Sequence, residues 1–371
     1  MTMLILTWSF ASTAAEFKSV ETDQSVREVH AKREAEKNSE SSPDAKSPQS
    51  RLLFEARLET TYNSNVFYFS RDEMDSFDTG SNSTGKFTDI DSIDDVILSP
   101  RFSVTFKDLF LGHTFMSGIV VTPHFYTQNE VKNYEDYQFN IRQYLSKGEF
   151  LEFDYEKTPE FMEGNFYDRD DTLYKKATYS EDRFTLAYNR PLSEDISIKA
   201  QYFYLMDDYN NNFNEYDMDS QALRLTIRKA FNEDLTGRLF GEYKYEDAQG
   251  DLGDTGRIES EPSREIWKIN LRGIYDLTSQ LQTYLQYGIW FIDYTTSHSV
   301  VDDSYHAQRN DVLQTIDWQA AYSVTKDVEL NILYQYTIKD ANPETDDLSI
   351  LDASILGYEM QQVSVGMKYS F

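Results

Sequence analysis

Apolar residues occupy every second position at the end of the chain, and this period of two constrains the fold more than any other feature. The apolar positions are Val363, Val365, Met367, Tyr369 and Phe371, with small or polar residues between them. Such alternation predicts an extended strand with one apolar face. Soluble domains usually end in frayed polar sequence, so an aromatic last residue favours a strand whose apolar face meets lipid. The alternative is the last strand of a soluble sandwich, which should continue into a polar tail.

The same alternation recurs in fourteen segments between residues 51 and 371, separated by short and long connections in strict alternation. Two long connections are expected at Asn63 to Asp95 and at Thr158–Asp170. Thr172–Asn189 fits one strand better than a hairpin turned at Ser180-Glu181-Asp182, because a hairpin would make the strand count odd. An even count, short turns on one side and long loops on the other are typical of outer-membrane barrels. We therefore expect an all-β fold, a closed antiparallel transmembrane β-barrel of about 14 strands with both termini periplasmic.

The composition agrees with this fold. The chain has 371 residues, no Cys, 27 Tyr, 24 Phe and a formal net charge of −29. It contains no apolar run of the ~18 residues that a transmembrane helix needs, whereas a barrel strand needs an apolar residue only at every second position. Tyrosine suits the bilayer interface because it joins an apolar ring to a polar hydroxyl. The negative charge would repel phosphates, so we expect no nucleic acid partner.

The first fifty residues differ from the rest. Met3 to Ala11 is apolar, and the small residues Ser12-Thr13-Ala14-Ala15 precede Glu16 as at a signal-peptidase site. We interpret residues 1–15 as a signal peptide, although the segment before the apolar run lacks the usual Lys or Arg. Residues 16–50 are rich in charged residues and Ser and poor in aromatics, which predicts a disordered periplasmic segment before a barrel at 51–371.

The second face of each predicted strand is polar, and a barrel would turn that face inward. Basic residues outnumber acidic ones on this face although the whole chain is acidic. The eighth to tenth strands form a predicted basic wall of Arg224, Arg228, Arg238, Lys268 and Arg272. Charged walls bias which ions pass a narrow pore.

Acidic residues gather on the predicted first and fifth strands, the fifth carrying Glu152, Asp154 and Glu156. Opposed basic and acidic walls would create a transverse field, so both sets are candidate solute-lining residues. The alternative is that the interior polar residues pair with one another and fill the barrel. Fourteen strands give a bore between that of a packed barrel of ~8 strands and that of an open one of ~16, which favours an aqueous channel.

The connections contain no recognisable reactive site. Eight carboxylates crowd the first one, at Asp72, Glu73, Asp75, Asp78, Asp89, Asp91, Asp94 and Asp95. Their spacing matches no Ca²⁺-binding loop, so we interpret them as a solvated surface or one bridged to lipopolysaccharide by divalent ions. The histidines show no zinc-binding spacing. We expect no catalytic residue, metal or cofactor; a surface enzyme using acidic loop pairs remains the minor alternative.

Two stretches resemble known families. Ser364, Gly366, Tyr369 and Phe371 occupy the places of the C-terminal assembly signal of outer-membrane β-barrels, which implies that the barrel-assembly machinery reads Gly366, Tyr369 and Phe371. With its strands, residues 51–371 look like a bacterial porin-type barrel. The stretch Tyr62-Asn63-Ser64-Asn65-Val66-Phe67 is similar to a motif of a β-barrel porin family often met near surface-polysaccharide genes.

Together these observations predict a porin-like channel in the bacterial outer membrane for passive diffusion of small hydrophilic solutes, with anions favoured by the basic wall. The expected partners are outer-membrane lipid and lipopolysaccharide, the barrel-assembly machinery and the solutes. The alternative is a barrel that anchors or assists surface-polysaccharide export or another envelope complex.

Overall fold

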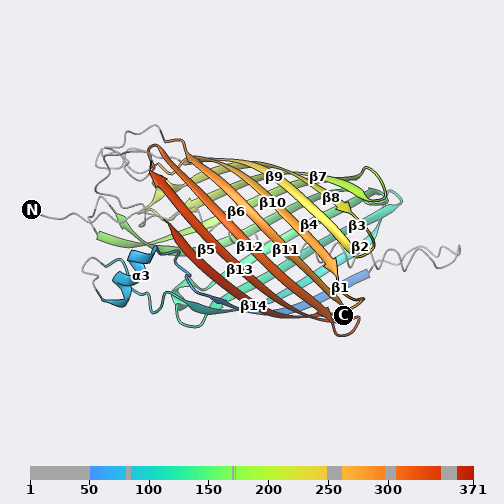
Figure 1. The fold of residues 1–371 in the computed structure, drawn as a ribbon, viewed down its shortest axis with the longest axis horizontal. Helices are drawn as coiled ribbons and strands as arrows, with labels where there is room; N and C mark the ends of the chain where they lie inside the picture. Colours follow the sequence, from blue (N-terminus) through green and yellow to red (C-terminus); the bar gives the residue numbers. More distant parts are fainter. Residues whose placement is uncertain are drawn as a thin grey trace, which may run out of the picture.

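The computed structural model describes residues 51–80, 85–168, 171, 173–248, 261–296, 306–343 and 357–371. Over these residues, antiparallel strands form one sheet that closes into a barrel, each strand pairing with its neighbours in sequence and β14 pairing with β1 (Figure 1). The fourteen strands are β1 (Arg51–Asn63), β2 (Asp95–Phe110), β3 (His113–Tyr126), β4 (Tyr134–Ser146), β5 (Glu149–Asp168), β6 (Leu173–Pro191), β7 (Ile196–Tyr209), β8 (Met218–Ala230), β9 (Leu235–Ala248), β10 (Arg264–Asp276), β11 (Leu281–Tyr294), β12 (Arg309–Ser323), β13 (Val328–Pro343) and β14 (Tyr358–Ser370). The predicted closed barrel is confirmed, whereas the predicted segments 1–15 and 16–50 lie outside the described residues.

Short helices lie in three of the described connections: α3 (Arg71–Asp78), η1 (Glu130–Lys132) and η2 (Asn214–Tyr216). Within the described ranges, no helix has both the length and the apolar character to cross a membrane.

The two ends of the barrel differ. The short turns at 111–112, 147–148, 192–195, 231–234, 277–280 and 324–327 lie at one end, together with Arg51 and Phe371. We call this the turn end. The opposite end holds α3 and the described parts of the long connections, and we call it the loop end (Figure 1).

The seam between β1 and β14 completes the sheet. Ala56 lies opposite Tyr369, and Glu59 lies opposite Gly366. At the turn end, Phe54 N donates to Phe371 O (3.1 Å) and Phe371 N donates to Phe54 O (3.0 Å). Closure leaves no strand edge, which matters because each unpaired backbone group in hydrocarbon costs several kcal/mol.

Side chains alternate between an apolar exterior and a covered interior along each strand. On β10, Trp267 and Leu271 point outward and are 54% and 61% exposed, whereas Lys268 and Asn270 between them are 8% and 7% exposed. A strand of this pattern turns its apolar face to lipid and its polar face to the interior. The alternation therefore sorts the side chains as the sequence predicts, with charged groups inside.

The predicted connection Thr158–Asp170 is wrong, because backbone pairing continues through most of it. Strand β5 runs to Asp168, and β6 begins at Leu173. The register between β5 and β6 shifts between Thr158 and Phe161 and again between Met162 and Gly164. A bulge inserts an extra residue and so breaks the period of two, which hides the strand from a search for alternation.

The interpretation of Thr172–Asn189 as one strand is confirmed by β6. Its middle residue Glu181 pairs with Thr158 on one side and with Asp207 on the other. A hairpin turned at Ser180-Glu181-Asp182 is thereby excluded.

Candidate functional site: the barrel interior

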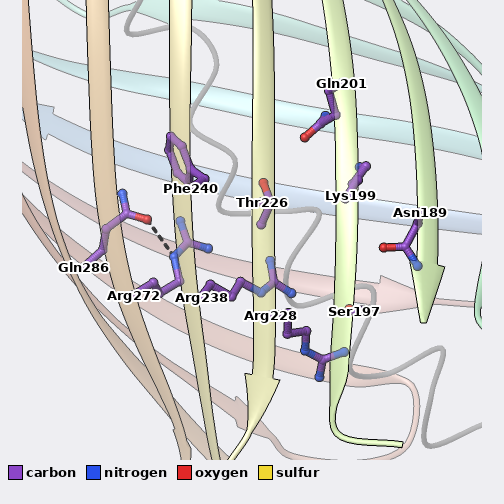
Figure 2. A pocket seen from close by; sticks show the side chains of 10 residues that line it. All are labelled: Asn189, Ser197, Lys199, Gln201, Thr226, Arg228, Arg238, Phe240, Arg272 and Gln286. Atoms are coloured by element: carbon purple, nitrogen blue, oxygen red, sulfur yellow. Dashed lines mark hydrogen bonds between the residues drawn. The ribbon is translucent and has the colours of Figure 1, made fainter. Parts of the chain in front are cut away.

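Three arginines from neighbouring strands form a row on the interior wall near the turn end. Arg228 on β8 lies opposite Arg238 on β9, which in turn lies opposite Arg272 on β10. Residues directly opposite one another on a sheet face have Cβ atoms about 5 Å apart. Figure 2 shows the three side chains extending from adjacent strands in one line. We call these residues the arginine row.

The arginine row lines a pocket of about 50 Å³, a size that suits a few waters or a small ion. The other lining residues are Lys199, Asn189, Ser197, Gln201, Thr226, Phe240 and Gln286 (Figure 2). Four of the lining residues are therefore cationic and none is acidic. The structure thus brings Arg228, Arg238 and Arg272 of the predicted basic wall to one place; whether they contact a solute stays a prediction.

Hydrogen bonds fix the end of the row at Arg272. Its Nε donates to Gln286 Oε1 (2.7 Å), and Gln286 Nε2 donates to Asp317 Oδ2 (2.7 Å). Gln335 Nε2 donates to the second oxygen of Asp317 (2.9 Å). The Arg272 guanidinium also lies over the Tyr284 ring, 4.5 Å from its centroid. Gln286 therefore links Arg272 to Asp317, and its amide orients the guanidinium.

The other two residues of the predicted basic wall share a carboxylate. Arg224 Nε donates to Glu242 Oε2 (2.6 Å), and Lys268 Nζ lies 3.2 Å from Glu242 Oε1. The Arg224 guanidinium also lies between the rings of Phe203 and Phe240, at 4.8 Å from each centroid. The basic wall therefore divides into the arginine row and a paired group farther from the turn end.

Four interior carboxylates each contact two cationic side chains. They are Glu152 with Arg142 and Lys199, Glu242 with Arg224 and Lys268, Glu246 with Lys244 and Arg264, and Asp311 with Arg309 and Lys339. All four carboxylates are buried. Buried charges need partners to offset the loss of hydration, and each of these carboxylates has two.

The predicted acidic wall does not face the basic wall as expected. Strand β5 lies three strands from β8 in the closed order, whereas β1 lies halfway around the barrel from β8. Glu152 contacts Lys199 directly (3.1 Å), and Glu156 lies 4.0 Å from Arg183. Asp154 is buried on the interior face of β5. The acids of β5 are therefore neighbours of the cations, and the opposed-wall prediction is wrong for that strand.

Toward the loop end the interior contains a cluster of buried apolar side chains beside the charged groups of Glu246 and Asp311, and the sequence analysis missed this cluster. One cluster of buried side chains gathers Tyr68, Phe161, Phe166, Ala177, Tyr179, Tyr209, Phe213, Tyr216, Ile266, Trp290, Ile292, Leu313, Tyr358 and Met360. We call it the aromatic cluster. Its rings contact one another across strands, with the centroids of Tyr179 and Tyr209 5.0 Å apart. Runs of consecutive apolar residues, such as Trp290-Phe291-Ile292, could have predicted this cluster. Such a run indicates that the strand is apolar on both faces.

The first long connection folds into this end of the barrel instead of forming a uniformly polar loop. Val66 to Phe69 are buried, and Tyr68 adopts a left-handed φ of 56°. Asn65 holds the bend: its Oδ1 accepts from Phe69 N (2.8 Å), and its Nδ2 donates to Phe69 O (2.8 Å) and to Glu359 O on β14 (3.3 Å). The motif that resembles a porin family therefore has a local structural role here.

A buried lysine in η1 secures the inserted segment. Lys132 Nζ donates to the carbonyl oxygens of Met162 (2.8 Å) and Glu163 (3.1 Å). It also lies 4.5 Å from the Phe67 ring centroid and 4.8 Å from that of Phe161. Lysine is seldom fully buried without partners, so this contact set joins the first connection, η1 and β5. The sequence offered no signal for it, since Lys132 lies in a polar connection.

The acidic residues of the first connection have separate structural contacts. Glu73 completes a capping box with Ser70 at the start of α3 and pairs with Lys86. Asp95 accepts hydrogen bonds from Thr127 N (2.9 Å) and Asn129 N (2.8 Å). In the described part of the chain, no group of three or more His, Cys, Asp or Glu is arranged to hold a metal ion.

The residues of the predicted assembly signal lie on the closing strand. Tyr369 and Phe371 stack on the outer face with ring centroids 5.4 Å apart, and Phe371 stacks on Phe54 at 5.7 Å. A Cβ at Gly366 would overlap the Asn331 side-chain amide on β13, so any larger residue there would require Asn331 to move. Recognition of these residues by assembly machinery stays a prediction.

These surfaces define the class of protein: a β-barrel of the bacterial outer membrane. Only helices and closed barrels satisfy all backbone groups inside a bilayer. An even-stranded antiparallel barrel with an apolar exterior, short turns at one end and long loops at the other is the outer-membrane form. The predicted location in the outer membrane follows from the closed sheet and its lipid-facing side chains.

Comparison with known proteins adds a likeness of architecture. No family model matches the chain, and no curated protein matches it. Among solved structures, the in-vitro folded outer membrane protein OmpT of Vibrio cholerae is similar at 9% identity, covering 88% of this chain and 99% of that one with a TM-score of 0.45. The outer membrane channel DcaP of Acinetobacter baumannii is similar at 13% identity, covering 87% and 97% with a TM-score of 0.45. The NanC porin is similar at 9% identity, covering 64% and 93% with a TM-score of 0.37.

Proposed function

We propose that this barrel is an outer-membrane channel for passive diffusion of small hydrophilic solutes, with a preference for anions. The observation that carries the proposal is the arginine row, Arg228, Arg238 and Arg272, which shares one pocket with Lys199. Like charges clustered on a low-dielectric wall raise the local concentration of counter-ions and lower that of co-ions. Charged rings select ions in pores for the same reason.

The paired groups of the interior support the same sign of selectivity. Each of Glu152, Glu242, Glu246 and Asp311 is shared between two cations. Two cations around one carboxylate attract an anion more strongly than a single ion pair does.

Short turns face the periplasm in barrels of this type, so the proposed orientation places the arginine row at the periplasmic end of the interior. Arg228 lies two residues before the end of β8, and Arg238 lies three residues after the start of β9. Solutes leaving the channel toward the periplasm would pass the row last.

Reversal potentials in planar bilayers test the proposal. Under a KCl gradient, the wild-type channel is expected to be anion-selective. The triple variant R228Q/R238Q/R272Q is expected to lower the anion-to-cation permeability ratio several-fold while the channel still conducts, because glutamine keeps polarity and removes charge. A cation-selective wild type, or an unchanged ratio in the triple variant, would overturn the anion preference.

A matched control lies in the same wall. The double variant R224Q/E242Q removes one positive and one negative charge that contact each other, so its net charge equals that of the wild type. We expect its permeability ratio to stay near the wild-type value. Heat-modifiable migration on gels would confirm that both variants have folded as barrels, and absence of any conductance in folded wild-type protein would refute the channel itself.

We further propose that the barrel acts without a chemical step. The interior carboxylates named above contact cations rather than one another or a nucleophile, which suits structural and electrostatic roles better than acid–base catalysis. Hydrolysis of peptide or phospholipid substrates by the purified folded barrel, abolished by replacing one of these carboxylates, would contradict this.

A further inference from the structure

The pocket beside the arginine row draws its cations from four consecutive strands. Arg228, Arg238 and Arg272 lie directly opposite one another on β8, β9 and β10. Lys199 on β7 lies opposite Thr226, two residues before Arg228, so it is a diagonal neighbour of Arg228. Diagonal neighbours on one sheet face are about 7–8 Å apart, within reach of long side chains. The four cationic groups can therefore contact one small ligand together (Figure 2).

The three guanidinium groups restrict the shape of that ligand. Each guanidinium presents a planar fork of N–H donors that matches a pair of oxygens on one anion. A carboxylate has one such pair of oxygens, and chloride has none. A phosphoryl group has three terminal oxygens, which form three pairs, one for each of Arg228, Arg238 and Arg272. The donor set therefore fits a phosphoryl group better than either of the other anions.

Burial strengthens the attraction between these cations and an anion. Lys199 is 9% exposed and Arg272 is 6% exposed, and charges interact more strongly where water is excluded. Lys199 also contacts Glu152 (3.1 Å), but Arg142 shares that carboxylate. Among the described residues, the ten that line the pocket include no Asp or Glu. An anion in the pocket therefore meets no acidic side chain in its lining.

One of these cations is held in place before any ligand binds. Arg272 Nε donates to Gln286 Oε1 (2.7 Å), and its guanidinium lies 4.5 Å from the centroid of the Tyr284 ring. A side chain that is already ordered loses less entropy when a ligand binds. Arg272 is therefore prepared to receive an anion at its end of the arginine row.

We propose that this pocket is a binding site for a phosphoryl group, carried by inorganic phosphate or by a phosphate monoester. The space of about 50 Å³ suits the phosphoryl group alone. The rest of a monoester would lie along the neutral lining residues Gln201 and Thr226, whose side chains can hydrogen-bond to hydroxyl groups. The role of the pocket in transport rests on the proposed anion channel, whereas binding can be measured without conduction.

Isothermal titration calorimetry of the folded full-length barrel in detergent, in phosphate-free buffer, tests the proposal. The probes are inorganic phosphate, glucose 6-phosphate, gluconate and glucose. We expect both phosphorylated probes to bind at one site and glucose not to bind. Gluconate should bind at least about tenfold more weakly, because its carboxylate offers a single pair of oxygens.

The order of affinities identifies the source of the phosphoryl group. Tighter binding of glucose 6-phosphate would assign the site to monoesters, and tighter binding of inorganic phosphate would assign it to the free ion. Gluconate binding as tightly as the phosphorylated probes would overturn the proposal.

A conservative variant separates the shape of the site from its charge. R238K keeps the positive charge but loses the fork of donors. Its affinity for inorganic phosphate should fall about tenfold or more, while its anion-to-cation permeability ratio in planar bilayers stays near the wild-type value. Wild-type affinity in R238K would overturn the proposal.

The matched control is K368Q/E329Q, which removes a cation and an acid that lie 3.3 Å apart on β14 and β13. This pair is at the turn end but outside the pocket, so the variant should bind inorganic phosphate as the wild type does. An equal loss of affinity in the control and in R238K would count against the pocket as the site. Heat-modifiable migration confirms folding of each variant.

The phosphoryl site and the channel can fail separately. A wild-type barrel that conducts anions but binds neither phosphorylated probe would overturn the site and leave the channel standing. A barrel that binds inorganic phosphate but conducts no ion would refute the channel and leave the site standing.

Discussion

The two halves of the barrel interior are built from the same alternation of side chains but differ in what the inward positions carry. At the turn end they carry the arginine row and Glu152 with its two cationic partners, whereas at the loop end they carry the aromatic cluster together with the buried ion groups of Glu246 and Asp311. In the first half, cationic side chains line the interior wall near the short turns. The second resembles the core of a soluble protein, where each buried large apolar side chain contributes roughly 1.5–3 kcal/mol.

Replacing the carboxylate that Arg224 and Lys268 share should have the largest effect. The variant E242Q leaves two cations beside an uncharged amide in a buried place, and breaking a buried ion pair on one side costs about 3–5 kcal/mol. The free energy of unfolding, measured by urea titration of the folded barrel in lipid vesicles, should fall by that amount.

An exposed acid provides the comparison for that measurement. The variant E233Q alters a turn residue in contact with solvent and should change the free energy of unfolding by less than about 0.5 kcal/mol. If the free energy of unfolding of E242Q fell by less than about 1 kcal/mol, Arg224 and Lys268 would not need the Glu242 carboxylate for stability. That result would contradict the prediction.

At the loop end, removing the Asn65 amide should loosen the inserted segment and leave the polar half intact. The variant N65A deprives Phe69 N and Phe69 O of their partners, and leaving buried backbone groups unsatisfied costs about 1–3 kcal/mol. Cleavage by trypsin at Arg71 and Lys86 depends on the opened population, so it should accelerate roughly 5- to 100-fold.

The control for that experiment is S76A on α3, which removes only a solvent-exposed hydrogen bond from Ser76 Oγ to Asp72 O, and for which we expect little change in cleavage. Ion selectivity in N65A should equal that of the wild type, because the arginine row lies at the other end. Cleavage at the wild-type rate in N65A would show that the insertion does not depend on this side chain.

The sequence predicted the strands well because period-two alternation is a local property. It also predicted that the members of the arginine row are neighbours, because β8, β9 and β10 are consecutive strands and consecutive strands pair in this sheet. It did not predict the contacts of Lys132, which join residues about thirty positions apart across the loop end. It also misplaced the acids of β5, since the position of a strand around the barrel depends on closure. The bulges near Phe161 hid part of β5 for a further reason: they change which positions face inward.

Raising the ionic strength should produce the smallest effect on ion selectivity. It tests the field of the arginine row without any change in fold. Raising the salt from about 0.01 M to about 1 M shortens the Debye length from about 30 Å to about 3 Å. The anion preference of the wild-type channel should therefore weaken in concentrated salt, and N65A should follow the same curve because its arginine row is unaltered. The variant R228Q/R238Q/R272Q should give a flatter curve in the same reversal-potential series. A wild-type ratio that does not vary with salt would mean that contacts at close range, rather than the field of the row, decide which ions pass.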